Sequence, residues 1–519
     1  MLVKTFGAAV NGIDAITITI EVLAQRGSLF SIVGLPDKAV KESSQRVQSA
    51  IVQSGLQFPR RNIVINMSPA DVKKEGAAYD LPIAVGMLAA SEIIKADMMQ
   101  EFMIMGELSL DGTVLPIRGA LPMAILARSM GIRGMIVPEA NAREAAVVNN
   151  LDVYGVKNLR QVVDFLNGDA ELSPTIVDTR AEFAKASAHF DFDFSEVKGQ
   201  EQVKRALEVA CAGGHNVLMV GAPGSGKSMV AKRLPSIMPP LTLSEALETT
   251  KIHSVSGSLK SGSMLMTTRP FRAPHHSISS VALVGGGSNP MPGEISLAHN
   301  GVLFLDEFAE FPRQVLEVLR QPLEDRHICV SRAKYTVDYP AGFMLVASMN
   351  PCPCGNYNNP GKPCTCMPGA VSRYLGRISG PLLDRIDIQV EIMPVPFEKL
   401  SSMTDGESSE TIRRRVVEAR AIQAVRFARE DGIHCNAQMN SRLMRTHCRL
   451  DEECTRILRD SMTRYNMSAR AYDRILKVAR TIADLAASPE ISAEHMYEAV
   501  SYRNLDRASW GASASPQPF

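Results

Sequence analysis

The sequence carries little excess charge of either sign and has no long apolar run. Its 56 basic and 55 acidic residues leave a formal net charge of +1 over 519 residues. The whole surface is therefore no polycation, and any contact with nucleic acid has to come from a local patch. No uncharged apolar run has the length that crossing a bilayer requires, and the N-terminus lacks the continuous apolar block of a signal peptide. We therefore expect a cytoplasmic protein without a membrane partner.

Cysteine is also scarce, and its distribution is uneven. The chain has nine cysteines. An odd number in such a chain disfavours a disulfide framework and favours thiols or metal ligands. Four of the nine fall within one short stretch, "NPCPCGNYNNPGKPCTC" (350–366), as two Cys-x-Cys pairs. This cysteine loop is therefore a candidate metal site.

The composition is that of an ordinary globular protein, with 45% apolar and 21% charged residues. The length predicts two or three domains. The first of these, over 1–168, mixes short β patterns with amphipathic helical patterns and is typical of an α/β domain. We predict strands at 15–22, 62–69, 102–110 and 134–140, and amphipathic helices at 38–55 and 80–94.

The rest of the chain divides by composition. A polar segment with Ser-Pro and acidic residues, 169–194, is typical of a linker. Strand, loop and helix patterns resume over 195–395, which includes the cysteine loop. The arginine-rich part that follows, 396–504, is helical. A C-terminal tail, 505–519, has the composition of a disordered segment.

One motif identifies a nucleotide site. "NVLMVGAPGSGKSMVAKRL" is an apolar strand, a glycine-rich loop and then a helix, which is the setting that a P-loop requires. The backbone N–H groups of such a loop cradle phosphate, helped by the helix N-terminus. Lys227 is expected to reach the β- and γ-phosphates of ATP, and the Ser228 hydroxyl to bind Mg²⁺. The predicted nucleotide-binding residues are Gly221, Ala222, Pro223, Gly224, Ser225, Gly226, Lys227 and Ser228.

Two further strands end on polar residues that fit the same site. "NGVLFLDEF" ends in Asp306 and Glu307; the first would hold Mg²⁺ through water and the second would act as general base toward the attacking water. "FMLVASMN" ends in Asn350, whose side-chain amide could orient that water. A lone Asn at a strand end is more often a turn residue, so this assignment is the weaker one.

Long motifs resemble one family. "VKGQEQVKRALEVACAGGHNVLMVGAPGSGKS", "RAPHHSISSVALVGGG", "GVLFLDEFAEF", "SMNPCPCG" and "RISGPLLDRIDI" resemble the magnesium-chelatase-like AAA+ ATPases of the bacterial ComM/YifB type, over nearly the whole chain. The resemblance implies an AAA+ P-loop domain with a helical lid that assembles into a ring, with a hexamer expected. It also implies a branch-migration helicase that acts on recombining DNA.

The resemblance also assigns arginines that spacing alone would not. Arg385, in "LLDRID", matches the arginine finger that one subunit inserts against its neighbour's γ-phosphate. Arg470, in "SARAYDRILKVAR", matches the sensor-2 arginine of the lid. Arg373 and Arg377 are rival candidates for the finger.

The N-terminal region resembles the proteolytic domain of Lon, a ribosomal S5-type α/β fold. Lon chemistry needs a serine nucleophile and a lysine that deprotonates it. The matching positions are Ala78 and Leu121, which supply neither group. Lys73 and Lys74 lie nearby in the sequence, but a base without a nucleophile does nothing. We therefore predict that the domain is not a protease and serves as a scaffold for ring assembly or DNA contact.

Two segments could contact a polymer in the centre of a ring. The glycine- and proline-rich segment 270–296 suggests a mobile hairpin insertion, in which His275 and His276 more plausibly form hydrogen bonds than bind metal. The segment 327–340 has two β-prone halves around a turn, with Arg332 and Lys334 near its tip. In a single chain, such a segment is most simply a solvated turn. In a ring, the copies from all subunits would place positive charges around one channel, where they could contact the phosphate backbone of DNA. This would allow DNA binding despite the low net charge of the chain.

The four cysteines of the loop, Cys352, Cys354, Cys364 and Cys366, supply the four thiolates that a tetrahedral structural Zn²⁺ requires. Cys-x-Cys is tighter than the usual Cys-x₂-Cys, so free thiols or a redox-sensitive loop are alternatives. Because the loop joins Asn350 to the Arg385 segment, zinc would stiffen that connection and would have no hydrolytic role.

Two other functions stay open on the sequence. A chelatase-type motor would drive magnesium insertion into a porphyrin through partner subunits. The Asp-x-Ser-x-Ser site of such partners is missing from this chain, which proves little for a motor subunit. A regulatory ATPase would act instead on protein clients recruited by its N-terminal domain.

Overall fold

The protein forms two compact units, each with its own sheet and core. The computed structural model describes residues 1–186, 190–259, 262–287, 290–332, 335–357, 359, 361–395, 406–465 and 467–503. The first unit comprises Met1–Ala186, Thr242–Thr267 and Pro290–Pro292. The second comprises Ser187–Leu241, Thr268–Asn289 and Gly293–Phe519.

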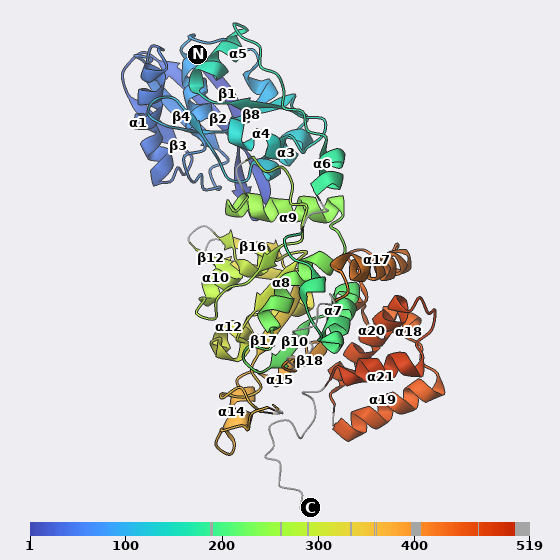
Figure 1. The fold of residues 1–519 in the computed structure, drawn as a ribbon. Helices are drawn as coiled ribbons and strands as arrows, with labels where there is room; N and C mark the ends of the chain where they lie inside the picture. The colour runs from blue at the N-terminus through green and yellow to red at the C-terminus, as the bar shows by residue number, and fades with distance from the viewer. Residues whose placement is uncertain are drawn as a thin grey trace, which may run out of the picture. The chain divides into compact units, whose positions relative to one another are not determined.

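A seven-stranded mixed sheet organises the first unit, in the order β3-β4-β2-β1-β5-β8-β9 (Figure 1). The β1–β2 and β2–β4 pairs are antiparallel, whereas β3–β4, β1–β5, β5–β8 and β8–β9 are parallel. Alternate residues of β2 point into the core, as its period of two predicts. The strands are β1 (Leu2–Asn11), β2 (Asp14–Gln25), β3 (Phe30–Val33), β4 (Asn62–Ser68), β5 (Phe102–Ile104), β8 (Gly134–Pro138) and β9 (Asp152–Val156).

The strands predicted for this unit are present, with two changes at their ends. The stretch 102–110 is divided into β5 and a separate short strand, β6 (Glu107–Leu108), which pairs with β7 (Val114–Leu115). The stretch 134–140 ends as a strand at Pro138, because Glu139 begins helix α4 (Glu139–Ala145).

Helix α1 (Lys38–Gln53) begins at Asp37, whose side chain accepts a hydrogen bond of 2.7 Å from the N–H of Val40. Helix α2 (Asp80–Ala90) was predicted to be amphipathic, and this was wrong: all of its residues are buried. It packs against β1, β2 and α1, so no face is left for solvent. The other helices of this part are α3 (Ala120–Ser129), α5 (Leu159–Asn167) and α6 (Thr179–Ala186).

A helix from the middle of the sequence completes the first unit. Helix α9 (Leu243–Ser256) packs against α3 and is tied to β-sheet and helix residues by polar contacts. Lys251 Nζ lies 2.7 Å from Asp14 Oδ1, and Ser254 hydrogen-bonds to the buried carboxylate of Glu144. The division by sequence placed all of 195–395 in one domain. Contacts assign 242–267 and 290–292 to the first unit instead.

The second unit is built on a five-stranded parallel sheet in the order β11-β14-β17-β10-β18. The central strands are buried along their whole length, which is why they read as continuous apolar runs in the sequence. The strands are β10 (Val217–Gly221), β11 (Phe271–Arg272), β14 (Val302–Leu305), β17 (Met344–Met349) and β18 (Ile388–Ile392).

Helices surround this sheet and continue into the helical lid. Residues of the sheet, of α7 and of the lid helices belong to one continuous hydrophobic core. The helices nearer the sheet are α7 (Glu201–Gly213), α8 (Lys227–Ile237), α10 (Ser280–Val284), α11 (Glu294–Leu297), α12 (Arg313–Glu317), α13 (Arg320–Asp325), α14 (Ala370–Leu375) and α15 (Gly380–Leu383). The lid helices are α17 (Ser409–Arg426), α18 (Ser441–His447), α19 (Glu452–Tyr465), α20 (Ala469–Leu485) and α21 (Ala493–Ser501).

The segment predicted as a linker is partly folded. Leu172, Val177 and Phe183 pack against the core of the first unit, and Phe194 is fully buried in the core of the second. These apolar residues are spaced too widely to produce a periodic signal in the sequence.

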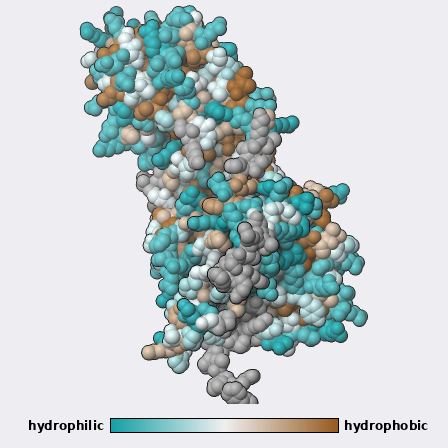
Figure 2. All heavy atoms as spheres, viewed as in Figure 1, coloured by the Kyte–Doolittle hydropathy of each residue, from teal (hydrophilic) through white to brown (hydrophobic). Residues whose placement is uncertain are grey.

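Hydrophilic side chains cover most of the face shown in Figure 2, and apolar ones occur in small scattered groups. Among the helices of the described residues, none combines the length and the apolar character that spanning a membrane needs.

Candidate nucleotide site and cysteine cluster

The P-loop follows β10, a central strand of the parallel sheet, and ends at the first turn of α8. Gly224 and Gly226 adopt left-handed φ values of 77° and 92°, which glycine adopts without steric cost. The Nζ of Lys227 donates hydrogen bonds to the carbonyls of Gly221 (2.7 Å) and Ala222 (2.9 Å) and to Asn350 Oδ1 (3.2 Å). The structure thus brings the predicted lysine and the predicted Asn350 together.

Burial lowers the pKa of Lys227, and the nearby carboxylates of Asp306 and Glu307 oppose that effect. The lysine is nevertheless held at the base of the loop by carbonyl oxygens, which favour its charged form. A phosphate entering the loop would offer the same ammonium group a stronger acceptor than these carbonyls.

Ser228 and Asp306 meet at the carboxyl edge of the sheet. The Ser228 hydroxyl donates a hydrogen bond of 2.5 Å to Asp306 Oδ2, and the other oxygen of Asp306 accepts from Ser348 and from the N–H of Glu307. A hydroxyl and a carboxylate at contact distance form the hard oxygen set that Mg²⁺ prefers. The residues present therefore fit the metal that was predicted here.

The fully buried Ser348 was not predicted from the sequence. A signal existed, because Ser348 and Asn350 are two residues apart at the end of β17 and therefore face the same side of the strand. The hydroxyl of Ser348 orients Asp306 from the neighbouring strand.

Glu307, the predicted general base, follows β14 in a left-handed conformation with φ 54°. Such a conformation is uncommon for a residue with a Cβ and occurs often at functional sites. Its Oε2 lies 3.0 Å from Nδ1 of His276. The ring of His276 also stacks on that of His275, with centroids 4.0 Å apart. The sequence favoured hydrogen bonding over metal binding for this His pair, and His276 lies against Glu307, the predicted general base.

The predicted finger, Arg385, is buried in its own subunit. Only 4% of its surface is exposed, its Nη2 lies 2.5 Å from Glu324 Oε1, and its Nη1 donates to the carbonyl of Pro381. An arginine that reaches a neighbouring subunit must first leave the Glu324 pair. Arg470 is exposed and its Nη1 lies 3.8 Å from Asp384.

The two rival arginines differ from Arg385 in exposure. Arg373 and Arg377 are both exposed on or just after α14. Arg377 forms an ion pair of 2.8 Å with Glu310, three residues after Glu307. Exposure therefore favours these two for contact with another molecule, whereas the family motif favours Arg385.

The four cysteines of the loop converge. All four Sγ atoms lie within 4.8 Å of one another, and the pairs of Cys352, Cys354 and Cys364 are 3.4, 3.6 and 3.8 Å apart. Four thiolates around a tetrahedral Zn²⁺ with Zn–S bonds of about 2.3 Å lie about 3.8 Å apart. The cysteines are free thiols, and their spacing fits a metal.

Two thiols of the cluster have pKa values shifted in opposite directions. Burial opposes ionisation of Cys354, but the backbone N–H groups of Asn356 and Thr365 lower the pKa of its thiol to about 5. A backbone hydrogen bond from Cys354 favours the ionised form of Cys366, but desolvation and the three neighbouring thiols together outweigh it and raise the pKa of Cys366 to about 12. Negative charges this close together oppose the ionisation of neighbouring thiols. A bound cation would favour the ionised form of these thiols.

The predicted hairpin is present as β15 (His327–Arg332) and β16 (Tyr335–Pro340), which pair antiparallel with Arg332 opposite Tyr335. Lys334 and the side chain of Arg332 lie outside the described residues. The predicted insertion over 270–296 contains α10, which Ser279 caps by accepting from the N–H of Ala282.

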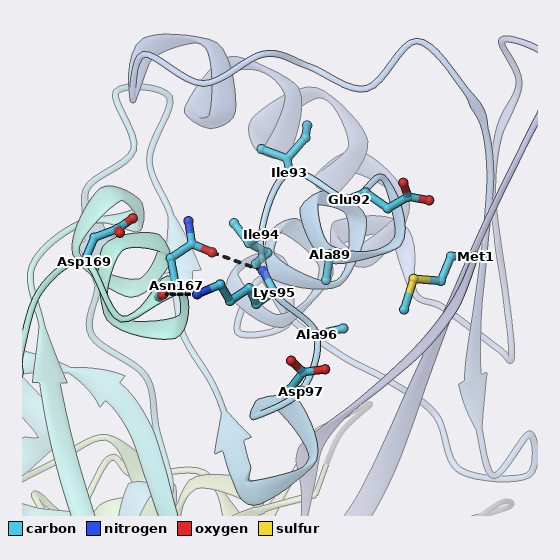
Figure 3. A pocket seen from close by; sticks show the side chains of 10 residues that line it. All are labelled: Met1, Ala89, Glu92, Ile93, Ile94, Lys95, Ala96, Asp97, Asn167 and Asp169. Carbon is cyan, nitrogen blue, oxygen red and sulfur yellow. Dashed lines mark hydrogen bonds between the residues drawn. The ribbon is translucent and has the colours of Figure 1, made fainter.

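A separate hollow of about 420 Å³ lies in the first unit (Figure 3). Lys95 closes one side of it, since its N–H and its Nζ each donate a hydrogen bond of 3.0 Å to Asn167. The other residues that line it are Met1, Ala89, Glu92, Ile93, Ile94, Ala96, Asp97 and Asp169. None of the residues predicted for nucleotide, metal or DNA lines this hollow.

Comparison with known proteins identifies the family. The family described as "Magnesium chelatase, subunit ChlI" matches residues 193–400, "Subunit ChlI of Mg-chelatase" matches 20–141, and "Magnesium chelatase, subunit ChlI C-terminal" matches 406–503. The uncharacterized protein YifB of Salmonella typhimurium is 44% identical over 502 residues, which cover 96% of each chain. The chain belongs to this magnesium-chelatase-like AAA+ family. Competence protein ComM of Haemophilus influenzae is 42% identical over 509 residues, 98% of each chain.

Both the family and the fold class predicted from the sequence are confirmed. Similarity to Lon is partial: Lon protease 2 of Thermus thermophilus is 26% identical over 165 residues, which cover 30% of this chain and 20% of that protein. At the two positions predicted for the Lon dyad, Ala78 packs against the core of the first unit and Leu121 is fully buried on α3. Of the nearby lysines, Lys74 is also buried and donates to the carbonyl of Pro69.

Proposed function

We propose that this AAA+ family member hydrolyses ATP and acts as a ring motor that translocates on or remodels DNA, with branch migration as the expected reaction. The observation that carries the ATPase part is the meeting of Lys227, Ser228, Asp306 and Asn350 at the ends of three parallel strands. The relationship to competence protein ComM supports DNA as the substrate of the motor. A hexameric ring in the cytoplasm is the assembly that the family resemblance favours.

The residues of the site have distinct roles in this proposal. P-loop N–H groups and Lys227 bind the phosphates of ATP. The hydroxyl of Ser228, with Asp306 acting through water, would hold Mg²⁺, which neutralises phosphate charge. Glu307 accepts the proton of the attacking water, and Asn350 orients that water. An arginine from a neighbouring subunit, Arg385 by the family motif, stabilises the transition-state charge, and Arg470 of the lid assists in its own subunit.

The cysteine cluster is assigned to zinc in the same proposal. Four thiol sulfurs within 4.8 Å match a closed structural site. The first unit is assigned a scaffolding role without peptidase activity, because Ala78 and Leu121 can supply neither a nucleophile nor a base.

The experiment is ATP hydrolysis with and without single-stranded and four-way-junction DNA. We expect DNA to stimulate hydrolysis, and Arg332→Ala/Lys334→Ala to abolish the stimulation while basal hydrolysis persists. Arg456→Ala/Arg459→Ala, on the exposed face of α19, removes the same charge and should leave the stimulation unchanged. If none of the DNA molecules tested changed the rate of ATP hydrolysis, the DNA assignment would be overturned.

The family description itself favours a second candidate, a chelatase-type motor that drives magnesium insertion into a porphyrin through partner subunits. Porphyrin metallation in a reconstituted mixture tests it. Hydrolysis that responds to neither DNA nor chelatase partners would favour the third possibility, a regulatory ATPase that acts on protein clients.

A further inference from the structure

The cysteine loop touches the P-loop directly, at Gly355 and Pro223. Gly355 is buried and has a left-handed φ of 78°. A Cβ added at Gly355 would lie 2.4 Å from Cδ and 2.8 Å from Cγ of Pro223. Real Cβ atoms do not approach carbon so closely, so only glycine allows the two loops to pack at this distance.

The cysteines hold Gly355 in that position. Gly355 follows Cys354 in the chain, and its N–H donates a hydrogen bond of 3.0 Å to the carbonyl of Cys352. Both cysteines belong to the cluster. The backbone that contacts Pro223 therefore lies only one or two residues from the sulfur ligands, so the positions of the sulfur atoms constrain it.

A second connection reaches the other end of the P-loop. Asn350 accepts a hydrogen bond from Lys227, and only Pro351 separates it from the buried Cys352. The cluster is thus linked to the P-loop at two points, near its start through Pro223 and at its end through Lys227.

The described residues of this loop are held by the sulfur atoms and by local hydrogen bonds among Asn356, Asn359 and Gly361. Pro353, the segment 361–365 and Met367 are exposed, so these described residues add little buried apolar contact to the loop. A metal on four thiolates would close this segment and remove the conformational freedom that it otherwise has.

We propose that metal bound by Cys352, Cys354, Cys364 and Cys366 holds the P-loop in its phosphate-binding shape, so that the metal content of the cluster controls nucleotide affinity. This inference rests on the proposed function for the identity of both sites. It assigns to the metal site a role in nucleotide binding that does not depend on DNA or on ring assembly.

The first test introduces the missing Cβ. We expect Gly355→Ala in the full-length chain to keep its metal, measured by elemental analysis, and to bind a fluorescent ADP analogue at least about tenfold more weakly, since overpacking a close contact has effects of this size. Gly369→Ala is the matched control, because Gly369 has nearly the same φ, 77°, and no heavy atom lies within 4 Å of an added Cβ. It reproduces the backbone strain without the contact.

A compensating change makes the test specific. Pro223→Ala removes the two ring carbons that the methyl group introduced by Gly355→Ala would meet. The double variant Gly355→Ala/Pro223→Ala should therefore bind the analogue about as well as Pro223→Ala alone. Equal affinities of the Gly355→Ala and Gly369→Ala variants would overturn the inference.

The second test removes the metal with a chelator and restores it with Zn²⁺, while circular dichroism follows the fold. We expect nucleotide affinity to fall on removal and to recover on addition. Full affinity in the metal-free protein would overturn this inference alone. A chain that binds no zinc at all, either as purified or after reconstitution, would overturn the proposed metal site together with it. Because no DNA is present, neither outcome depends on the motor assignment.

Discussion

The hydroxyl of Ser228 and the carboxylate of Asp306 are joined by a hydrogen bond of 2.5 Å although 78 positions separate them in the chain. Ser228 lies in the first turn of helix α8 and Asp306 directly follows strand β14, and parallel pairing of the strands brings these two positions to one edge of the sheet. This edge is where ligands bind in open parallel sheets. Substitutions at and next to this pair therefore test the predicted binding of Mg²⁺ and hydrolysis of ATP.

Asp306→Asn is expected to remove most of the benefit of Mg²⁺ in nucleotide binding. An amide lacks the negative charge that attracts the cation, so hydrolysis should fall by about a hundredfold. Titration of a fluorescent ATP analogue with and without Mg²⁺ measures the effect on binding. Asp460→Asn, on exposed α19, is the control that changes the same charge without touching the site. An Asp306→Asn variant with an unchanged response to Mg²⁺ would contradict the assignment.

Glu307→Gln separates binding from hydrolysis. The amide keeps the size of the side chain but cannot accept a proton, so turnover should fall by about a hundredfold or more. ATP should still bind, because Lys227 and the P-loop N–H groups are unchanged. Turnover is measured by phosphate release, and binding by retention of radiolabelled ATP on the protein. A parallel loss of binding would indicate that Glu307 has a structural role instead.

The structure brings several residues of the predicted nucleotide site together, and local sequence patterns explain why. The P-loop, Asp306 and Asn350 each follow a fully buried strand, and adjacent parallel strands necessarily present their ends together. Contacts between side chains that are far apart in the chain could not be predicted from local sequence patterns. The approach of His276 to Glu307 depends on the turn after β11, and that of Gly355 to Pro223 on the path of the cysteine loop.

Some features of the fold carried no signal in the sequence. Helix α9 follows the P-loop helix in sequence but belongs to the first unit. It does so because it packs against α3 of that unit. Composition within 242–267 does not reveal which core those residues join. The full burial of α2 was also not predicted. A helix that is packed on all sides has no polar face, and the sequence prediction of amphipathic helices relies on such a face.

A buried charge cluster between β18 and the lid predicts how stability depends on pH. Arg474 Nη1 lies 3.0 Å from Asp387 Oδ1, and the ring of His215 lies between Asp387 and Thr481. Burial opposes ionisation of Asp387, but Arg474 and His215 hold its pKa well below the usual range. Burial lowers the pKa of His215.

The lowered pKa values of Asp387 and His215 both make the folded state less stable as the pH falls. A carboxylate with a lowered folded-state pKa stabilises the fold above its unfolded pKa of about 3.9 and loses that effect as the pH falls. A histidine with a lowered pKa costs stability below its unfolded pKa of about 6.5, where the unfolded chain takes up the proton more readily. Urea unfolding should therefore show a stability that declines from pH 7 to pH 5, and His447 and His495, whose pKa values burial also lowers, add to the effect of His215.

Asp387→Asn should lower the free energy of unfolding by about 3–5 kcal/mol at pH 7, because it leaves Arg474 without its buried partner. Asp384→Asn is a suitable control, since Asp384 lies three residues away at a more exposed position. If both variants unfold at the same urea concentration, the cluster does not stabilise the lid contact.

His276 offers a test of how Glu307, the predicted general base, is positioned. Its Nδ1 lies 3.0 Å from Glu307 Oε2, and its ring is held by the stacked ring of His275 and by an edge contact with Phe311. Glu307 is otherwise exposed at the end of its strand, with 56% of its side chain accessible. Removing the imidazole therefore releases the carboxylate from its present orientation. Misplacing a catalytic group by about 1 Å can cost about a hundredfold in rate.

We expect His276→Ala to reduce kcat by about tenfold or more, with little change in KM for ATP, because the P-loop contacts are untouched. His276→Asn keeps a side-chain N–H that can reach the carboxylate and should recover part of the rate. His275→Ala removes the stacking partner but leaves the contact with Glu307, so its effect should be smaller. Equal rates for the Ala and Asn variants, or a change confined to KM, would show that the imidazole supports the fold of the turn and does not orient Glu307.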